Sequence, residues 1–233
     1  MSLPDLSGLA VGETKEQFRA AWKAACGTRP KFRRWASLRR GSSKWTLLHN
    51  VAREADVEPE NYVSAYERID IDDIVKDGSL HSVEHVVPRS MINGGSPGDA
   101  EDDPLGWIEA TPRANSRRGS LPLVLWPGSY DGRRQHFAPP ESERARLARK
   151  WLFIRMTYAN VDAIAPPSEA QIAHCRQIIE LAKTWPIQGA ERRFNEIYHT
   201  RRGYSNPLLR PNASRWYDSP WFAEIVFGPE CVR

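Results

Sequence analysis

The sequence contains few cysteines, three in 233 residues, at positions 26, 175 and 231. They are far apart and odd in number, and no two of them have the short spacing of a zinc site. We therefore expect neither a structural zinc site nor a disulfide framework.

Long apolar runs are also absent, as are internal repeats and low-complexity stretches. The first residues, Met1–Asp5, do not form a basic region followed by an apolar run, so no signal peptide is expected. No stretch approaches the length that spans a bilayer. These absences favour a soluble, intracellular and cytoplasmic protein with no membrane partner.

The composition is typical of a globular chain with a basic surface. Hydrophobic residues make up 40% and charged residues 27%, which argues against a disordered chain. Lysine and arginine total 33 against 29 acids, and the nine tryptophans suit core packing or base stacking. One basic pair alone is ordinary solvated surface, but a set spread along the chain suits a phosphate-binding surface. The basic clusters are Lys31–Arg34, Arg39–Arg40, Arg117–Arg118, Arg133–Arg134, Arg192–Arg193 and Arg201–Arg202.

The first third of the chain shows one clear helix and no chemistry. Apolar residues at helical spacing predict a helix over residues 13–26, ended by Gly27. Residues 31–60 combine a basic segment with a further helix around Trp45–Glu54. Residues 61–77 fit either short strands or a mixed segment, and the sequence does not separate these alternatives.

The middle of the chain predicts two short strands followed by a helix. A β-rich run over Ser82–Val87 ends at Pro88, which is typical of a strand leading into a loop. A glycine-rich loop over residues 92–104 separates it from a second strand at Trp107–Ala110. Thr111 or Pro112 then opens a helix that carries Asn115.

The second half is predicted to be mostly helical. Helices are expected over residues 141–160, over 168–184 with a capping pattern at its start, and over 187–199. Residues 204–211 form a turn-rich segment. The expected fold class is therefore α+β, mainly helical with a small ββα core.

Glu84 and His85 are the residues with the clearest chemical potential. An acid beside a histidine is common, and the ordinary interpretation is a surface carboxylate next to a hydrogen-bonded ring. The context favours a site, because the pair lies at a strand end and the helix with Asn115 follows thirty residues later. That helix also carries Arg117 and Arg118, which are suited to phosphate.

At these residues the sequence resembles the endonuclease I family of the ββα-metal (His-Me finger, HNH-like) nucleases. The family's Glu-His-Val-x-Pro motif corresponds to Glu84–Pro88, and its Asn-x-x-Arg-Gly motif corresponds to Asn115–Gly119. An arginine-rich helix at 144–156 and the segments Trp185–Pro186, Glu191–Phe194 and Asn206–Pro207 follow in the family's order. The resemblance covers about residues 61–212. It implies a nuclease domain over 61–233, preceded by a basic, helical N-terminal extension over 1–60.

The chain departs from the family's pattern in the loop between the motifs. The family's Asp-x-His-Asn stretch appears here as Pro104–Trp107, and the loop is short. A family arginine that helps hold the cleaved phosphate has no clear counterpart, and Arg89, Arg113 and Arg118 are candidate substitutes. Secreted relatives are often rich in cysteine, so the scarcity here again favours an intracellular role.

The resemblance implies hydrolysis of phosphodiester bonds in DNA, with RNA as an alternative substrate, and with little sequence preference from the nuclease core. His85 would be the general base, with its ring held by a backbone carbonyl. Glu84 and Asn115 would bind one Mg²⁺ (or Mn²⁺), and Arg118 would grip the phosphate. Consecutive strand residues point to opposite faces, so Glu84 and His85 can share a site only where the strand twists or ends.

Two other functions remain open at this point. The lost polar stretch before the second strand suits a nucleic-acid-binding protein on a catalytically decayed nuclease scaffold. The many tryptophans also suit a protein-interaction module. Magnesium-dependent nicking of a plasmid separates the enzyme from both alternatives.

Overall fold

The chain is a mainly helical α+β protein with one two-stranded antiparallel sheet in the part that its computed structural model describes. The structure describes residues 10–28, 66, 82–92, 100–123, 125–126, 137–158 and 164–232. The helix expected around Trp45–Glu54, most of the segment 61–77 and the glycine-rich stretch 93–99 lie outside these residues. The expected fold class is confirmed.

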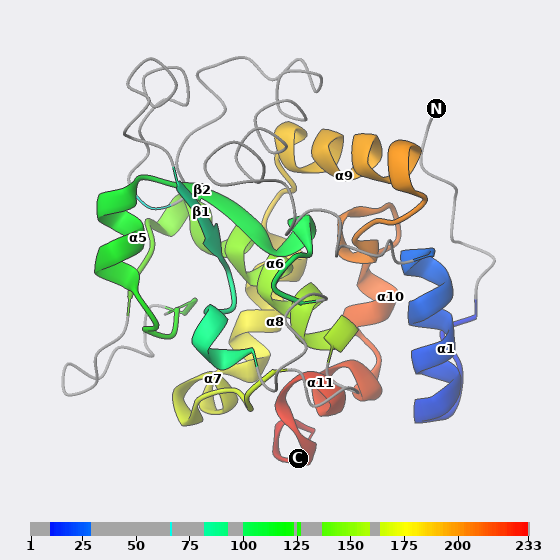
Figure 1. Cartoon of the computed structure of the whole chain (residues 1–233). Coiled ribbons are helices and arrows are strands. Elements are labelled where there is room, and N and C mark those ends of the chain that lie inside the picture. The colour runs from blue at the N-terminus through cyan, green and yellow to red at the C-terminus, as the bar shows by residue number, and fades with distance from the viewer. Residues whose placement is uncertain are drawn as a thin grey trace.

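The two predicted strands and the following helix form one compact unit (Figure 1). Strand β1 (Ser82–His85) pairs with β2 (Trp107–Ala110), and the register places His85 opposite Trp107. Helix α5 (Pro112–Arg118) starts where the Thr111 side chain accepts a hydrogen bond from the Ala114 N–H, with proline in its first turn. This unit is the ββα core that the sequence predicts.

Helix α6 (Glu141–Tyr158) is the centre of the helical body, and it lies behind the hairpin in Figure 1. It contacts α8 (Cys175–Thr184), α11 (Pro220–Phe227) and the short 3-10 helix Pro104–Gly106 that leads into β2. Gly106 allows this approach, because a Cβ there would lie 2.7 Å from two Ile154 carbons. The hairpin is thereby packed directly against α6.

Further helices belong to the described part of the chain. They are α1 (Lys15–Cys26), α7 (Glu169–Ala173), α9 (Gly189–Arg202) and α10 (Ser214–Tyr217), with further 3-10 helices at Arg89–Met91, Pro207–Leu209 and Pro229–Cys231.

Helix α1 packs into the same core as the rest of the chain. Trp22 makes an edge contact with Trp216 at 5.3 Å between ring centroids, and it also contacts Phe153 and Phe222. Phe18 and Trp22 are both buried. The domain boundary expected at residue 60 stays a prediction, because residues 29–65 lie outside the described part.

Two sequence expectations need correction. The single helix expected over 168–184 is two helices, α7 and α8, separated at His174, whose backbone leaves the helical conformation. Cys175 and Cys231 form a disulfide, so the expectation of no disulfide was wrong. Their separation of 56 residues gave no sequence signal, and tertiary packing brings the start of α8 to the C-terminal 3-10 helix. Cys26 is free and buried.

None of the described helices combines the length and the apolar character that crossing a bilayer requires.

Candidate active site

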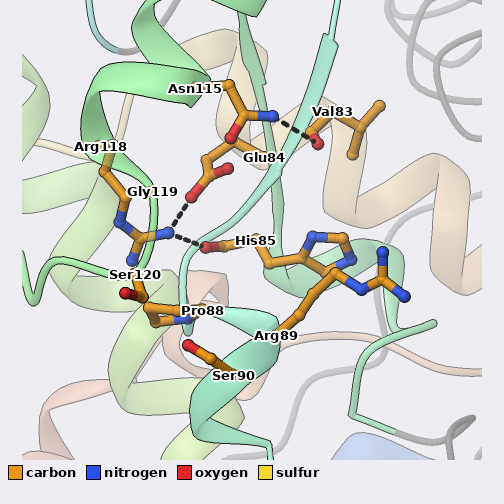
Figure 2. A pocket seen from close by; sticks show the side chains of 10 residues that line it. All are labelled: Val83, Glu84, His85, Pro88, Arg89, Ser90, Asn115, Arg118, Gly119 and Ser120. Atoms are coloured by element: carbon orange, nitrogen blue, oxygen red, sulfur yellow. Dashed lines mark hydrogen bonds and ion pairs between the residues drawn. The ribbon is translucent and has the colours of Figure 1, made fainter.

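A pocket of about 370 Å³ lies at the end of β1 (Figure 2). The strand, the turn that follows it and the C-terminal half of α5 form its walls. Its lining residues are Val83, Glu84, His85, Pro88, Arg89, Ser90, Asn115, Arg118, Gly119 and Ser120. All four residues that the sequence singles out therefore line one pocket.

His85 is held by the backbone of the loop before β2. Its Nε2 lies 2.9 Å from the carbonyl oxygen of Glu101, and a carbonyl can only accept, so Nε2 carries the proton. In the neutral ring Nδ1 then carries the lone pair. The carbonyl that the sequence could not identify is that of Glu101.

The loop that supplies this carbonyl is anchored by Asp103. This buried carboxylate accepts hydrogen bonds from the Leu105 N–H and from the hydroxyls of Tyr158 and Tyr204, at 2.9 to 3.0 Å. Burial raises the pKa of Asp103 to about 6, although these hydrogen bonds oppose the rise. Asp103 thus ties the loop to α6 and to the segment after α9.

Glu84 is 5% exposed and forms an ion pair with Arg118. The Arg118 NH1 group donates to Glu84 Oε1 and, at 2.8 Å, to the carbonyl of His85. Its remaining hydrogen bonds go from NH2 to the Val86 carbonyl at 3.0 Å and from Nε to the Leu121 carbonyl at 2.9 Å. Arg118 therefore clamps the strand end and holds one oxygen of the Glu84 carboxylate.

This environment bears on the phosphate role expected for Arg118. Its side chain is 1% exposed, and four of the five N–H bonds of a guanidinium are directed at protein acceptors. Burial lowers the pKa of Arg118. The contacts of Arg118 are those of a positioning residue, and its direct grip on phosphate stays an untested prediction that they do not favour.

Asn115 presents its amide oxygen to the pocket. Its Nδ2 donates to Ser82 Oγ at 2.8 Å and approaches the Val83 carbonyl at 3.4 Å, which fixes the orientation of the amide. The side-chain oxygen is thereby turned toward the Glu84 carboxylate (Figure 2). Within the described part of the chain, neither this oxygen nor Glu84 Oε2 accepts a hydrogen bond.

The strand geometry that seemed to separate Glu84 from His85 is resolved by the strand end. Their side chains leave β1 in different directions, Glu84 toward α5 and His85 toward Arg89, as alternation requires (Figure 2). Because β1 stops at His85, the pocket reaches around the end of the strand and is lined by both residues.

The donor set fits a hard divalent cation that keeps most of its waters. Among the described residues no three His, Cys, Asp or Glu side chains gather as a metal cluster. One carboxylate oxygen and one amide oxygen are nevertheless the kind of small protein share that Mg²⁺ accepts. Glu84 Oε2 and Asn115 Oδ1 are suited to this role by chemistry and by orientation.

Arg89 is the exposed arginine of the pocket. Its side chain is 68% exposed, and its Nε pairs with Glu101 Oε1 at 2.6 Å, so its terminal nitrogens are within reach of solvent. Sequence reasoning named Arg89 only as one of three substitutes, because no local pattern distinguishes it. It missed Glu101 and Trp107 entirely, since a backbone carbonyl and a core indole carry no motif.

The chain was compared with protein families and with curated proteins. No protein-family model matches the chain, and no curated protein matches it.

Proposed function

We propose that this protein is a metal-dependent endonuclease that hydrolyses phosphodiester bonds of DNA. The observation that carries the proposal is the convergence of an oriented imidazole, a carboxylate oxygen and an amide oxygen on one pocket at the end of β1. The β1–β2–α5 order and the motifs at Glu84–Pro88 and Asn115–Gly119 support the resemblance to the endonuclease I family of the ββα-metal nucleases.

His85 is the proposed general base. With Nε2 committed to the Glu101 carbonyl, Nδ1 accepts a proton from a water molecule, and the water oxygen attacks phosphorus. The bond between phosphorus and the leaving oxygen then breaks. Histidine suits this step because its ordinary pKa lies close to neutral pH.

Glu84 Oε2 and Asn115 Oδ1 are the proposed protein ligands of one Mg²⁺ (or Mn²⁺). When bound, such an ion neutralises phosphate charge and stabilises the leaving oxygen. Arg118 orients the Glu84 carboxylate through their buried ion pair. In this proposal Arg118 acts through Glu84, and the exposed Arg89 contacts the phosphate.

DNA is the proposed partner, and RNA is an alternative substrate. The exposed arginines Arg89, Arg113 and Arg117 lie on the pocket turn and on α5, where they suit contacts to a phosphate backbone. Such contacts carry no sequence information, so we expect weak sequence preference. A cytoplasmic location stays a prediction, and the Cys175–Cys231 disulfide favours an oxidising compartment instead.

Nicking of supercoiled DNA tests the proposal. Purified protein should nick the plasmid with Mg²⁺ present and stop when a chelator is added. His85→Ala should lower the rate by about 100-fold or more, the usual contribution of a general base, while circular dichroism and the thermal midpoint stay near those of the wild type. Full activity of His85→Ala would remove this mechanism.

A catalytically decayed nucleic-acid-binding protein is the second candidate. The observation that favours it is the Arg118 guanidinium on Glu84, which already neutralises the proposed metal ligand. Salt-sensitive DNA binding with no cleavage in Mg²⁺ or Mn²⁺ would support this candidate and exclude the enzyme.

A further inference from the structure

One backbone carbonyl beside the pocket accepts hydrogen bonds from two side chains. The Glu101 oxygen lies 2.9 Å from His85 Nε2 and 2.8 Å from the indole nitrogen of Trp107. Both distances are those of good hydrogen bonds. The acceptor that orients the proposed base is therefore itself held by a second donor.

Trp107 is well placed to hold this carbonyl still. It is 1% exposed and belongs to β2, directly opposite His85 in the strand register. Its ring meets the His85 ring edge to face, with centroids 6.2 Å apart and planes at 76°. A buried side chain on a paired strand has little rotamer freedom, so its N–H points in a fixed direction.

The ion pair at the Glu101 side chain is a weaker link. Arg89 pairs with the Glu101 carboxylate, but the arginine side chain is 68% exposed. Exposed ion pairs are screened and contribute little. This pair also holds the Glu101 side chain rather than the carbonyl that His85 uses.

We propose that Trp107 is a positioning residue for His85, which it serves by fixing the Glu101 carbonyl with its indole N–H. This inference rests on the proposed nuclease function. Without Trp107 the carbonyl would lose a buried hydrogen-bond donor, and the His85 ring would sample unproductive orientations. A loss of orientation lowers kcat and leaves substrate binding largely unchanged.

The kinetic test compares Trp107→Phe with a matched control, Trp22→Phe. Trp22 is also a buried tryptophan, 3% exposed, and its indole donates to Thr157 Oγ1 at 3.3 Å, away from the pocket. We expect Trp107→Phe to lower kcat about tenfold, the scale of one buried hydrogen bond, with KM within about twofold. Trp22→Phe should keep the wild-type kcat. Equal kcat values for the two variants, or a change confined to KM, would overturn the inference.

Nitrogen-15 NMR of the wild-type protein tests the same hydrogen bonds without requiring that a variant folds or that the protein cleaves DNA. Nitrogen-15 NMR at about pH 8, where an ordinary histidine is neutral, should place the His85 proton on Nε2. It should also show slow solvent exchange for the Trp107 indole N–H. A proton on Nδ1, or a rapidly exchanging indole, would overturn the inference. If the wild type fails to cleave DNA, the proposed function is wrong. The hydrogen-bond arrangement at Glu101 is still tested, since this NMR result does not depend on cleavage.

Discussion

The described part of the molecule holds several buried arginine–glutamate ion pairs, and two of them, Arg149–Glu191 and Arg118–Glu84, differ in how they use the carboxylate. Arg149 on α6 donates to both oxygens of Glu191, from Nε at 2.9 Å and from NH2 at 2.7 Å. Arg118 on α5 donates to one oxygen of Glu84, and its remaining hydrogen bonds go to backbone carbonyls. Both pairs are almost fully buried.

In the Arg149–Glu191 pair both carboxylate oxygens accept hydrogen bonds from the arginine, which suits a structural role. In the Arg118–Glu84 pair only one oxygen does, which leaves the other available for chemistry. Arg149 also donates to the Ala182 and Trp185 carbonyls, so the Arg149–Glu191 pair fastens the end of α8 and the start of α9 to α6 with its carboxylate saturated. The Arg118–Glu84 pair leaves Glu84 Oε2 on a pocket beside the Asn115 amide oxygen. Burial and ion pairing are alike in these two pairs, and they differ in that an oxygen of Glu84 lies on the pocket beside the Asn115 amide.

The largest expected effect comes from neutralising each carboxylate in turn. Glu84→Gln and Glu191→Gln should each lower the free energy of unfolding by about 3–5 kcal/mol, because each leaves a buried arginine without its counter-charge. Only Glu84→Gln should also lower cleavage per folded molecule, by about 100-fold or more. Urea denaturation and plasmid nicking measure the two quantities. Equal losses of activity per folded molecule in the two variants would erase the distinction.

A smaller effect is expected from the disulfide that staples α8 to the C-terminal segment. Its two cysteines are 56 residues apart, and reduction should lower the free energy of unfolding by about 2–4 kcal/mol. Cleavage per folded molecule should not change, since neither cysteine lines the pocket. The double variant Cys175→Ser/Cys231→Ser is the control, because reductant should have no further effect on it. If reduction lowers activity while the protein stays folded, the disulfide region affects the pocket, and this prediction is wrong.

The smallest effect, taken per pH unit, is a pH dependence from Lys150, which lies in the structural region on α6. Burial lowers its pKa from 10.5 to about 8, with Glu109, Glu191 and Asp103 opposing the shift and Arg146 adding to it. Between these two pH values the unfolded chain holds a proton that the folded chain has lost, so stability rises with pH. Below about pH 8 both states are protonated and this gain is absent.

Lys150→Met should remove this rise, which amounts to at most about 1.4 kcal/mol per pH unit within the window. Lys183→Met is the matched control, because Lys183 pairs with Asp218 at the surface. Urea midpoints between pH 7 and about 10.5 give the comparison. The assignment of the rise to Lys150 fails if both variants follow the wild-type curve.

Local signals predicted most of the fold. The strand expected over Ser82–Val87 is present but ends two residues earlier, at His85. The strand at Trp107–Ala110 and the helix opened by Thr111 and Pro112 were expected from patterning and from a capping residue. The break at His174 was missed because the apolar pattern continues from α7 into α8. No propensity at His174 overrides that pattern, so only the packed structure reveals the break.

The sequence by itself determined the ββα order and put Glu84, His85 and Asn115 on it, because strand ends, prolines and helix caps act over a few residues. Tertiary structure alone decided which groups hold them. The carbonyl that binds His85 comes from 16 residues away, and the arginine on Glu84 comes from 34 residues away. Such partners are brought together by tertiary packing, and residues so far apart in the sequence share no local pattern that predicts their contact.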